Sequence, residues 1–465
     1  MGFLDGLNNM LRFIQRFPDP DDLFGVRQRY EDYIQRRRDY RMGEQDKQLK
    51  VKMGQADDNV RCNLIGKAIN QSVYLLVGQG VDFDLPGDDN AKEDVWLDAC
   101  WKANNKQVLL HRSVQNACEA GNGYIKIVPD GMVGMLEGKE NVFPRLVCLD
   151  PKWLSMETNP EDFEQVIRYI IRFNTTAPDG SDRARKQVIE FADPGWLISD
   201  YYNDHSTYGK WVLMSEENWN YPFAPIVEWQ NLPSPNSVYG EADISDDIIE
   251  LQDRYNFVAS NINKIIRYHA HPKTYGINVG KPDKESMGPD QMTLFTSGAG
   301  GDKAMIGNLE MQSDLESSIN FFDILGKSIL DNTSTVDVNN LKDKLGQLTN
   351  FAVRVLFNDA ISKMNVKRQL LEIALKDLNH RLLVLAKLPD DPGEVVWPES
   401  VLPVNETEVL NAQKTELELG IVSKQTISME RGRDYEEEQK RIGEESANES
   451  NVGDRILRTF ERGQQ

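Results

Sequence analysis

QLTNFAVRVLFNDAISKMNVKRQLLEIALKDLNHRLLVLAKL occupies residues 347–388 and contains neither glycine nor proline. Its apolar residues recur at helical spacing: Leu348, Phe351, Val355, Ala360, Met364, Leu371, Leu375, Leu378, Leu382 and Leu385. A continuous helix of this length would span about 60 Å, which one compact globular core cannot cover. The stretch therefore predicts a long helix that packs against partners in a coiled coil, a repeat array or a ring of identical subunits.

Length and composition indicate a large globular chain with two to four structural modules. The 465 residues are 40% hydrophobic and 27% charged, which is ordinary for folded proteins. The formal charge of −21 argues against general affinity for nucleic acid through a basic surface, although it allows a channel that DNA slides through. The four cysteines, Cys62, Cys100, Cys118 and Cys148, form no CxxC pair and indicate reduced, buried thiols.

The first sixty residues read as a polar helical arm. Residues 1–17 can form an amphipathic helix, for which we expect ordinary docking in preference to membrane binding. No run approaches 18 apolar residues. An arginine cluster (Arg36, Arg37, Arg38 and Arg41) lies among tyrosines, a pattern that can bind nucleic acid. Because acidic residues dilute this cluster, we expect a solvated helix face instead.

The pattern then changes from helical to extended. Residues 61–80 predict a helix that leads into the strand VDFDL, and a second helix is expected from Val95 to Glu119. Short runs rich in β-branched and aromatic residues follow: YIKIV, PRLVCL, QVIRYIIRF, KQVIEFA and KWVLM. Turn signals such as Pro129-Asp130-Gly131 and Pro178-Asp179-Gly180 separate them. These runs predict an antiparallel sheet inserted in a helical protein.

A heptad-like seam follows the predicted sheet. Apolar residues repeat there in 4-3-4-3-4-3 order: Ile244, Ile248, Leu251, Tyr255, Val258, Ile262 and Ile265. Such a seam requires an apolar surface on a neighbouring helix. Ser245 is a candidate N-cap, and the acidic first turn suits the helix dipole.

Beyond this helix come a turn-rich segment and further helices. Ser313 and Glu316 form a candidate capping box for a second helix. The polar stretch DNTSTVDVNNLKDK then leads into the long predicted helix. A short strand is expected around Val395–Trp397, a small helical region at 405–440, and a mobile charged tail after it.

This order of parts resembles the portal (connector) proteins of tailed double-stranded DNA bacteriophages, most closely the long-tailed-phage (siphophage) type. The resemblance covers residues 60–440. It is carried by NLIGKAINQSVYLLVGQGVDF, NACEAGNGYIKI, NSVYGEADISDDIIELQDRYNFVASNINKII, LTNFAVRVLFNDAISKMNVKRQLLEIAL and GIVSKQTISMERGRDYEEEQKRI, in this order. None is a catalytic fingerprint.

The resemblance implies an α+β, mainly helical phage-portal fold with a long wing helix, two stem helices, an antiparallel β-sheet in the wing and a small α/β clip insert. The implied divisions are an N-terminal helical arm at 1–60, a wing at 61–240, stem helix 1 at 241–268, a clip at 269–312, stem helix 2 at 313–331, a tunnel loop at 332–346, the long wing helix and strand at 347–403, a crown at 404–440 and a mobile tail at 441–465.

The implied function is a ring, usually of twelve subunits, at one capsid vertex of the virion, assembled in the host cytoplasm. Double-stranded DNA would pass through its channel during packaging and ejection. The implied partners are the terminase large subunit, a head–tail adaptor, and the major capsid and scaffold proteins, with no membrane role. No enzymatic activity, catalytic residue, metal or cofactor is expected.

Three groups of residues are candidate functional positions under this resemblance. The DNA-facing tunnel loop would use Thr333, Ser334, Asn339, Asn340, Lys342 and Lys344. The clip would bind partners through Tyr275, Met287, Met292, Phe295 and Gly298. Stem packing would use Ile248, Leu251, Tyr255, Val258 and Ile262. The alternatives are that the two lysines are simply solvated, and that Phe295 belongs to the core of the clip.

Other motifs give weaker signals. The segment from Asp82 to Glu93 approaches a calcium-loop pattern, but Pro86 removes a ligand. Two glycine-rich segments, at 134–139 and 298–303, lack the spacing of a phosphate-binding loop. Two other functions remain as alternatives: a metal-dependent nuclease or phosphohydrolase that uses scattered carboxylates, and a non-portal scaffold or peripheral membrane protein.

Overall fold

The structure is a computed structural model. It describes residues 26–51, 57–86, 91–136, 138–176, 180–203, 210–235, 237–270, 273–277, 305–309, 315–337, 350–398, 402 and 406–443. The chain divides into two compact units. The first comprises 1–339 and 357–399, and the second comprises 340–356 and 400–465.

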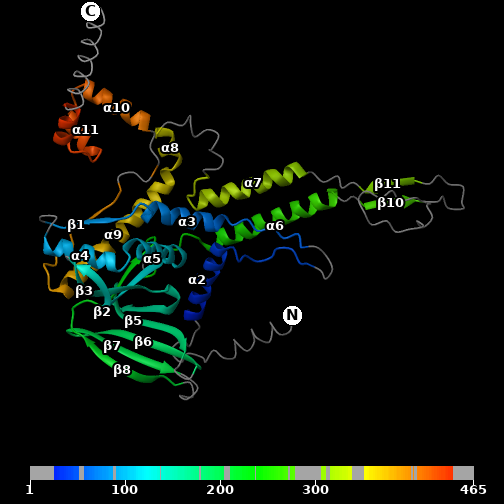
Figure 1. The fold of residues 1–465 in the computed structure, drawn as a ribbon. Helices are drawn as coiled ribbons and strands as arrows, with labels where there is room; N and C mark the ends of the chain where they lie inside the picture. Colours follow the sequence, from blue (N-terminus) through cyan, green and yellow to red (C-terminus); the bar gives the residue numbers. More distant parts are fainter. Residues whose placement is uncertain are drawn as a thin grey trace, which may run out of the picture. The chain divides into compact units, whose positions relative to one another are not determined.

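Seven helices are described in the first unit (Figure 1): α2 (Val26–Met42), α3 (Leu64–Val77), α4 (Lys92–Ala103), α5 (Lys106–Ala120), α6 (Asp246–Ala270), α7 (Leu315–Asn332) and α9 (Asn358–Ala386). The second unit contains α8 (Asn350–Leu356), α10 (Glu406–Glu418) and α11 (Lys424–Glu430). The helices predicted near 61–80, 244–268, 313–331 and 405–440 are thus present.

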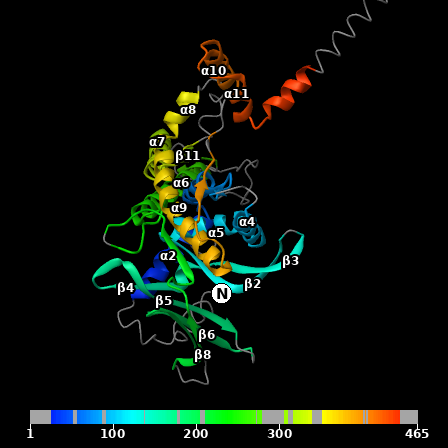
Figure 2. The same ribbon diagram turned by 90° about the vertical axis from the view of Figure 1, so that its left-hand side faces the viewer.

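Two antiparallel sheets form where a single sheet was expected. One has the strand order β3-β2-β9, formed by β2 (Asn122–Leu136), β3 (Lys139–Cys148) and β9 (Ile226–Gln230). The other has the order β4-β5-β6-β7-β8, formed by β4 (Leu154–Asn159), β5 (Asp162–Thr176), β6 (Asp182–Ala192), β7 (Gly195–Asn203) and β8 (Val212–Trp219). A 3-10 turn, η1 (Pro151–Trp153), joins β3 to β4, and Figure 2 shows the long β2–β3 hairpin beside the five-stranded sheet.

Two short ladders complete the described strands. β1 (Asp82–Asp84) pairs with β12 (Glu394–Val396), so both strands predicted at these places form and pair with each other. β10 (Lys273–Ile277) pairs with β11 (Met305–Leu309), and this ladder lies beyond the far ends of α6 and α7 (Figure 1).

Three local predictions were wrong. The helix expected from Val95 to Glu119 is interrupted at Asn104 and Asn105; Asn105 adopts a left-handed conformation (φ 53°), which asparagine tolerates better than most residues. Pro129-Asp130-Gly131 is not a turn. The strand β2 runs through it, with a shift of register between Val128 and Met132, because an unpaired bulge accommodates a proline without an N–H.

The third wrong prediction is the continuous helix over 347–388. Helix α8 ends at Leu356, Phe357 has ψ near 4°, and α9 begins at Asn358. Valines before this point and Asn358-Asp359 after it have lower helix propensity than the leucine-rich segment that follows. The long helix is therefore α9 alone, with 29 residues.

The core of the first unit lies around α3, α5 and α9. These helices bury aliphatic side chains that are at most 1% exposed: Ile65, Ile69, Leu110, Val114, Leu371, Leu375, Leu378 and Leu382. A second cluster, centred on Tyr124, Ile189 and Ile226, packs between the two sheets. The predicted buried thiols fit this picture for Cys100 and Cys118, whereas Cys62 and Cys148 are half-buried.

Candidate functional site

The segment that follows α7 begins as a tightly bonded turn. Ser334 is left-handed (φ 55°), the Thr335 N–H donates to the Leu330 carbonyl at 2.8 Å, and the Ser334 N–H donates to Asp331 at 3.0 Å. This is the Schellman arrangement that ends helices. The hydroxyls of Thr333 and Thr335 are 2.8 Å apart and buried. Two predicted loop residues, Thr333 and Ser334, therefore lie in a rigid helix terminus.

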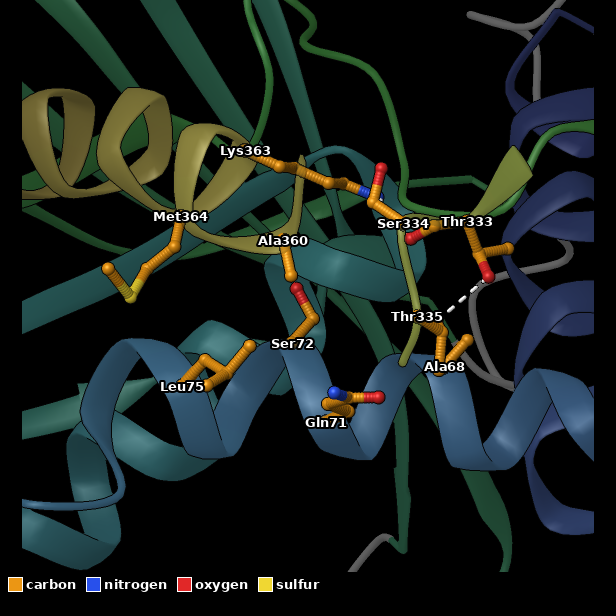
Figure 3. A pocket seen from close by; sticks show the side chains of 10 residues that line it. All are labelled: Ala68, Gln71, Ser72, Leu75, Thr333, Ser334, Thr335, Ala360, Lys363 and Met364. Atoms are coloured by element: carbon orange, nitrogen blue, oxygen red, sulfur yellow. Dashed lines mark hydrogen bonds between the residues drawn. The ribbon is translucent and has the colours of Figure 1, made fainter. Parts of the chain in front are cut away.

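A small cavity of about 20 Å³ adjoins this turn. Side chains of α3, of the turn and of α9 line it: Ala68, Gln71, Ser72, Leu75, Thr333, Ser334, Thr335, Ala360, Lys363 and Met364 (Figure 3). Its size suits about one water molecule, and hydroxyl and amide groups are available to bond it. The cavity is too small for a nucleotide or a cofactor.

A buried ion cluster lies next to the cavity. The Asp243 carboxylate accepts bonds from the Lys367 ammonium at 2.6 and 2.7 Å, and Lys363 approaches it to 3.3 Å. The Asp243 and Lys367 side chains are each 2% exposed. Asn231 donates to Asp243 at 3.1 Å, and Lys367 also donates to the Ser72 hydroxyl at 2.7 Å.

The two buried partners hold each other in the charged state. Burial opposes ionisation of Asp243, but the ammonium groups of Lys367 and Lys363 hold its pKa well below the ordinary value. Burial likewise opposes the charge on Lys367, but Asp243 raises its pKa above the usual one. Breaking such a pair leaves one uncompensated buried charge.

This cluster joins four parts of the chain. Asp243 immediately precedes α6, Lys367 lies on α9, Ser72 lies on α3, and Asn231 follows β9. Lys363 also reaches the Thr333 carbonyl, at 3.5 Å. Lys367 also contacts the buried Cys118 thiol at 3.4 Å. Because Asp243 keeps the Lys367 ammonium protonated, it cannot act as a base towards Ser72 or Cys118, and the chemistry of the cluster is that of a structural junction.

The inward face of α6 carries a polar seam that was not anticipated. Gln252, Asn256 and Ser260, spaced four residues apart, are each 0% exposed. They bond the backbone of the segment 57–64: Asn256 accepts from the Cys62 N–H at 3.0 Å, Gln252 donates to the Cys62 carbonyl at 2.6 Å, and Ser260 accepts from the Val60 N–H at 2.9 Å. The seam therefore supplies the hydrogen bonds that a neighbouring strand would otherwise give to this irregular segment.

The predicted stem seam packs partly against α7. Ile248 and Tyr255 are buried, whereas Leu251, Val258 and Ile262 are half-buried. The Tyr255 ring stacks on Phe322, with ring centres 4.1 Å apart. A Cβ at Gly326 would come within 3.1 Å of the Tyr255 ring, which explains glycine at this contact.

The two paired helices also expose large apolar side chains: Phe257, Ile266, Ile319, Phe321 and Ile324. Their exposed fractions run from 36% for Phe257 to 58% for Ile324. These exposed apolar side chains are candidate contacts for association with neighbouring copies.

The arginine cluster of α2 is not a solvated face, so that prediction was wrong. Arg37 is 1% exposed and bonds the Ile244 carbonyl at 2.6 Å and Asp246 at 3.0 Å. Arg38 binds Asp150 at 2.8 Å and Glu119 at 3.0 Å. Arg41 also binds Glu119. These groups attach α2 to α5 and to the start of α6, while Arg36 remains exposed.

Many of the predicted site residues lie outside the described residues. These are Asn339, Asn340, Lys342 and Lys344 of the loop, Met287, Met292, Phe295 and Gly298 of the clip, and the candidate cap Ser313. The amphipathic segment 1–17 lies outside them as well. Tyr275 is placed in β10, where its backbone pairs with Gly307.

Within the described ranges, no group of three or more histidine, cysteine or carboxylate side chains could hold a metal ion. Asp82 and Asp84 of the calcium-like segment lie on β1, and Asp82 pairs with Lys106 at 2.9 Å. Among the described helices, none has the length and apolar character needed to cross a membrane.

The described elements include the paired helices α6 and α7, the β10–β11 ladder beyond their ends and the long helix α9. The family described as "Phage portal protein, SPP1 Gp6-like" matches residues 24–452, and the chain belongs to this family. No curated protein matches the chain significantly. The family fits the observed mixture of helices and antiparallel sheets.

Membership establishes the protein's role. It is a structural, non-enzymatic component that forms an oligomeric ring in the phage capsid and serves as the vertex portal for DNA packaging. The enzyme alternative is therefore rejected.

Sequence reasoning missed the two polar features at the centre of the first unit. The Gln252, Asn256 and Ser260 seam had a signal in its four-residue spacing, beside the apolar stripe of the same helix. Asp243 and Lys367 are 124 residues apart, and nothing in a single sequence pairs them.

Proposed function

We propose that α6 and α7 form the stem of the ring, that β10 and β11 belong to the clip, that 332–346 is the tunnel loop and that 404–440 is the crown. The observation that supports this most is the apolar surface of the paired helices, because Phe321 and Ile324 are exposed in the single chain. Neighbouring copies around an axis would cover it.

Negative-stain electron microscopy of the purified protein tests this organisation. We expect toothed rings with a central hole, usually of twelve subunits. A protein that stays monomeric at every concentration, even when produced with its shell and scaffold proteins, would contradict the proposal.

We further propose that the loop after α7 contacts DNA without gripping it. Its base is fixed by the turn at Thr333–Thr335 and by the ion pair between Lys67 and Asp337 at 2.7 Å. The charge of −21 per chain disfavours the strong, salt-dependent binding that many lysine and arginine contacts create. Lys342 and Lys344 would touch phosphates transiently.

The double variant Lys342→Ala and Lys344→Ala should assemble normally but package or retain DNA less efficiently. Asn339→Ala together with Asn340→Ala, in the same loop, is the matched variant with unchanged charge, and we expect the smaller defect there. Normal packaging and retention by the lysine variant would reject the role.

The clip is proposed to bind the terminase large subunit and afterwards a head–tail adaptor. The β10–β11 ladder supports this, because it pairs the two ends of the insert with each other. Deletion of 283–305 should leave rings that no longer bind terminase in a pull-down assay. The major capsid and scaffold proteins are the expected neighbours at the vertex, with assembly in the host cytoplasm.

A further inference from the structure

A groove of about 560 Å³ runs between α5 and the strand β3. One wall is the α5 face that carries Val108, Leu109 and Arg112. The opposite wall is β3, from Arg145 to Cys148, and Trp153 of η1 also lines the groove. The groove is thus bounded by a helix and by an edge strand, the geometry into which extended peptides bind by adding a strand.

A side chain already bonds part of the outer edge of β3, the edge that faces the groove. Among the described strands, β3 pairs with β2 alone. Leu149, directly after β3, directs its N–H towards β2 and donates to the Tyr124 carbonyl at 3.1 Å. Because successive residues of a strand direct their backbone groups to opposite edges, Pro144, Leu146 and Cys148 direct theirs away from β2.

Asn104 occupies the first position of this outer edge. Its amide nitrogen donates to the Pro144 carbonyl at 2.9 Å, and its amide oxygen accepts from the Leu146 N–H at 2.8 Å. One asparagine therefore makes the pair of bonds that one residue of a parallel neighbouring strand would make. The next pair along the edge is the Leu146 carbonyl and the Cys148 N–H, and both residues line the groove. Beyond this pair the Asn116 amide donates to the Leu149 carbonyl at 3.2 Å.

The groove walls combine apolar surface with uncompensated positive charge. Val108 and Trp153 are 50% and 43% exposed. Arg112 and Arg145 are exposed, and in the described part of the chain neither forms an ion pair or hydrogen bond. The carboxylate that also lines the groove, Asp150, is bound by Arg38 at 2.8 and 3.1 Å. The lining therefore favours an occupant with carboxylates.

We propose that this groove is a docking site for an extended peptide segment of a partner protein, with carboxylate and apolar side chains in alternation. One residue of the segment donates to the Leu146 carbonyl and accepts from the Cys148 N–H, continuing the ladder that Asn104 begins. Apolar side chains of the segment contact Val108 and Trp153, and its carboxylates pair with Arg112 and Arg145. None of the lining residues belongs to the segments assigned to the stem, the clip or the loop, so failure of this proposal would leave the proposed organisation of the ring intact.

Fluorescence anisotropy with a fluorescein-labelled peptide of four Val-Glu repeats tests the proposal. The assembled full-length protein should bind this probe saturably, with a Kd below about 1 mM. A four-repeat Val-Lys probe should bind at least about tenfold more weakly, because like charges meet in the groove. Absence of saturable binding up to about 1 mM would overturn the proposal.

Two variants and one modified probe locate the contact. Arg112→Glu with Arg145→Glu should reduce affinity for the Val-Glu probe at least about tenfold and improve binding of the Val-Lys probe. Lys139→Glu with Lys210→Glu makes the same change of net charge elsewhere and should leave binding unchanged. Equal loss in both double variants would show a general charge effect and reject the site.

A Val-Glu probe methylated at every backbone nitrogen should lose binding, since it cannot donate to the Leu146 carbonyl. Unchanged binding of this probe would reject strand addition. Binding by the unassembled chain but not by the ring would show that a second copy fills the groove, for example through its edge strand β8, and would reject a partner peptide as the occupant. Circular dichroism spectra of all variants should match that of the wild type.

Discussion

The two faces of α6 differ in whether their side chains find partners within the same chain. The inward face carries Gln252, Asn256 and Ser260, fully buried and bonded to backbone groups of the same chain. The outward side, with the adjoining surface of α7, leaves Phe257, Phe321 and Ile324 exposed. The polar side chains of α6 thus bond other parts of the same chain, whereas the exposed apolar side chains are available to neighbouring subunits. Contacts within the chain should determine folding, and the exposed apolar ones should determine assembly.

The largest effect on folding is expected at the buried ion cluster. Asp243→Ala leaves Lys367 charged and buried, and should lower the free energy of unfolding by about 3–5 kcal/mol. Urea unfolding of the unassembled chain measures this. Asp98→Ala removes an ion pair in which both side chains are more than half exposed, and should change stability by less than about 1 kcal/mol. A similar loss of stability in both variants would show that the buried ion cluster contributes no more than an exposed ion pair.

A pH dependence of stability is the second expected effect. Burial raises the pKa of Glu228 to about 7 from 4.5, although Tyr169 donates to its carboxylate at 2.7 Å. The folded state therefore holds a proton that the unfolded state releases, and the free energy of unfolding should fall as pH rises from about 4.5 to 7. A shift of this size corresponds to about 3 kcal/mol.

Glu228→Gln imitates the protonated side chain, so it should exceed the wild type in stability at pH 8 and match it near pH 4. Denaturant unfolding at both pH values provides the comparison. Glu164→Gln, at an exposed position of β5, serves as control and should follow the wild type. A wild-type-like pH profile for Glu228→Gln would refute the assignment.

The third effect concerns the polar seam of α6. Asn256→Leu leaves the Cys62 N–H and the Gln45 side chain without their partner, and should cost about 2 kcal/mol. Hydrogen exchange at the Cys62 amide should accelerate. Lys264→Leu, on an exposed position of the same helix, should change neither quantity. Slow exchange at Cys62 in Asn256→Leu would show that the segment 57–64 is held by other contacts.

The smallest effect on folding, joined to the largest effect on assembly, is expected at the exposed face. Phe321→Glu should change the free energy of unfolding of the unassembled chain by less than about 0.5 kcal/mol, since the side chain is 47% exposed. Rings should nevertheless be absent in negative stain. Lys327→Glu, which introduces the same side chain on α7, should still form rings. Rings formed normally by Phe321→Glu would place the subunit interface elsewhere.

The sequence predicted regular elements where one periodicity runs without interruption. The 244–265 repeat and the stripe from Leu315 to Ile329 both became helices, and β-branched runs became strands. Prediction failed where one or two residues act against the pattern, as at Asn104-Asn105, at Phe357 and at the bulge near Pro129. Local helix propensity and a proline without an N–H account for the last two. At Asn104 a contact distant in sequence takes part, because the Asn104 amide binds β3.

The arginine cluster of α2 shows the same limit for charges. Nearby acidic residues in the sequence suggested a solvated face, but the carboxylates that bind Arg37 and Arg38 are those of Asp246, Glu119 and Asp150, more than 80 residues away. Local sequence reports which charges are present, but not which of them meet.

The sequence alone determined the order of helical and extended segments, the need of its long apolar helices for neighbouring subunits, and the portal family. It could do so because hydrophobic periodicity is a local property that can be recognised in the sequence itself. Tertiary structure alone decided the pairing of Asp243 with Lys367, the polar seam that holds 57–64, and the groove beside β3. These features depend on backbone groups and charges that folding brings together from distant parts of the chain. The interactions of the buried ion pair and of the polar seam also gain their strength from the exclusion of water.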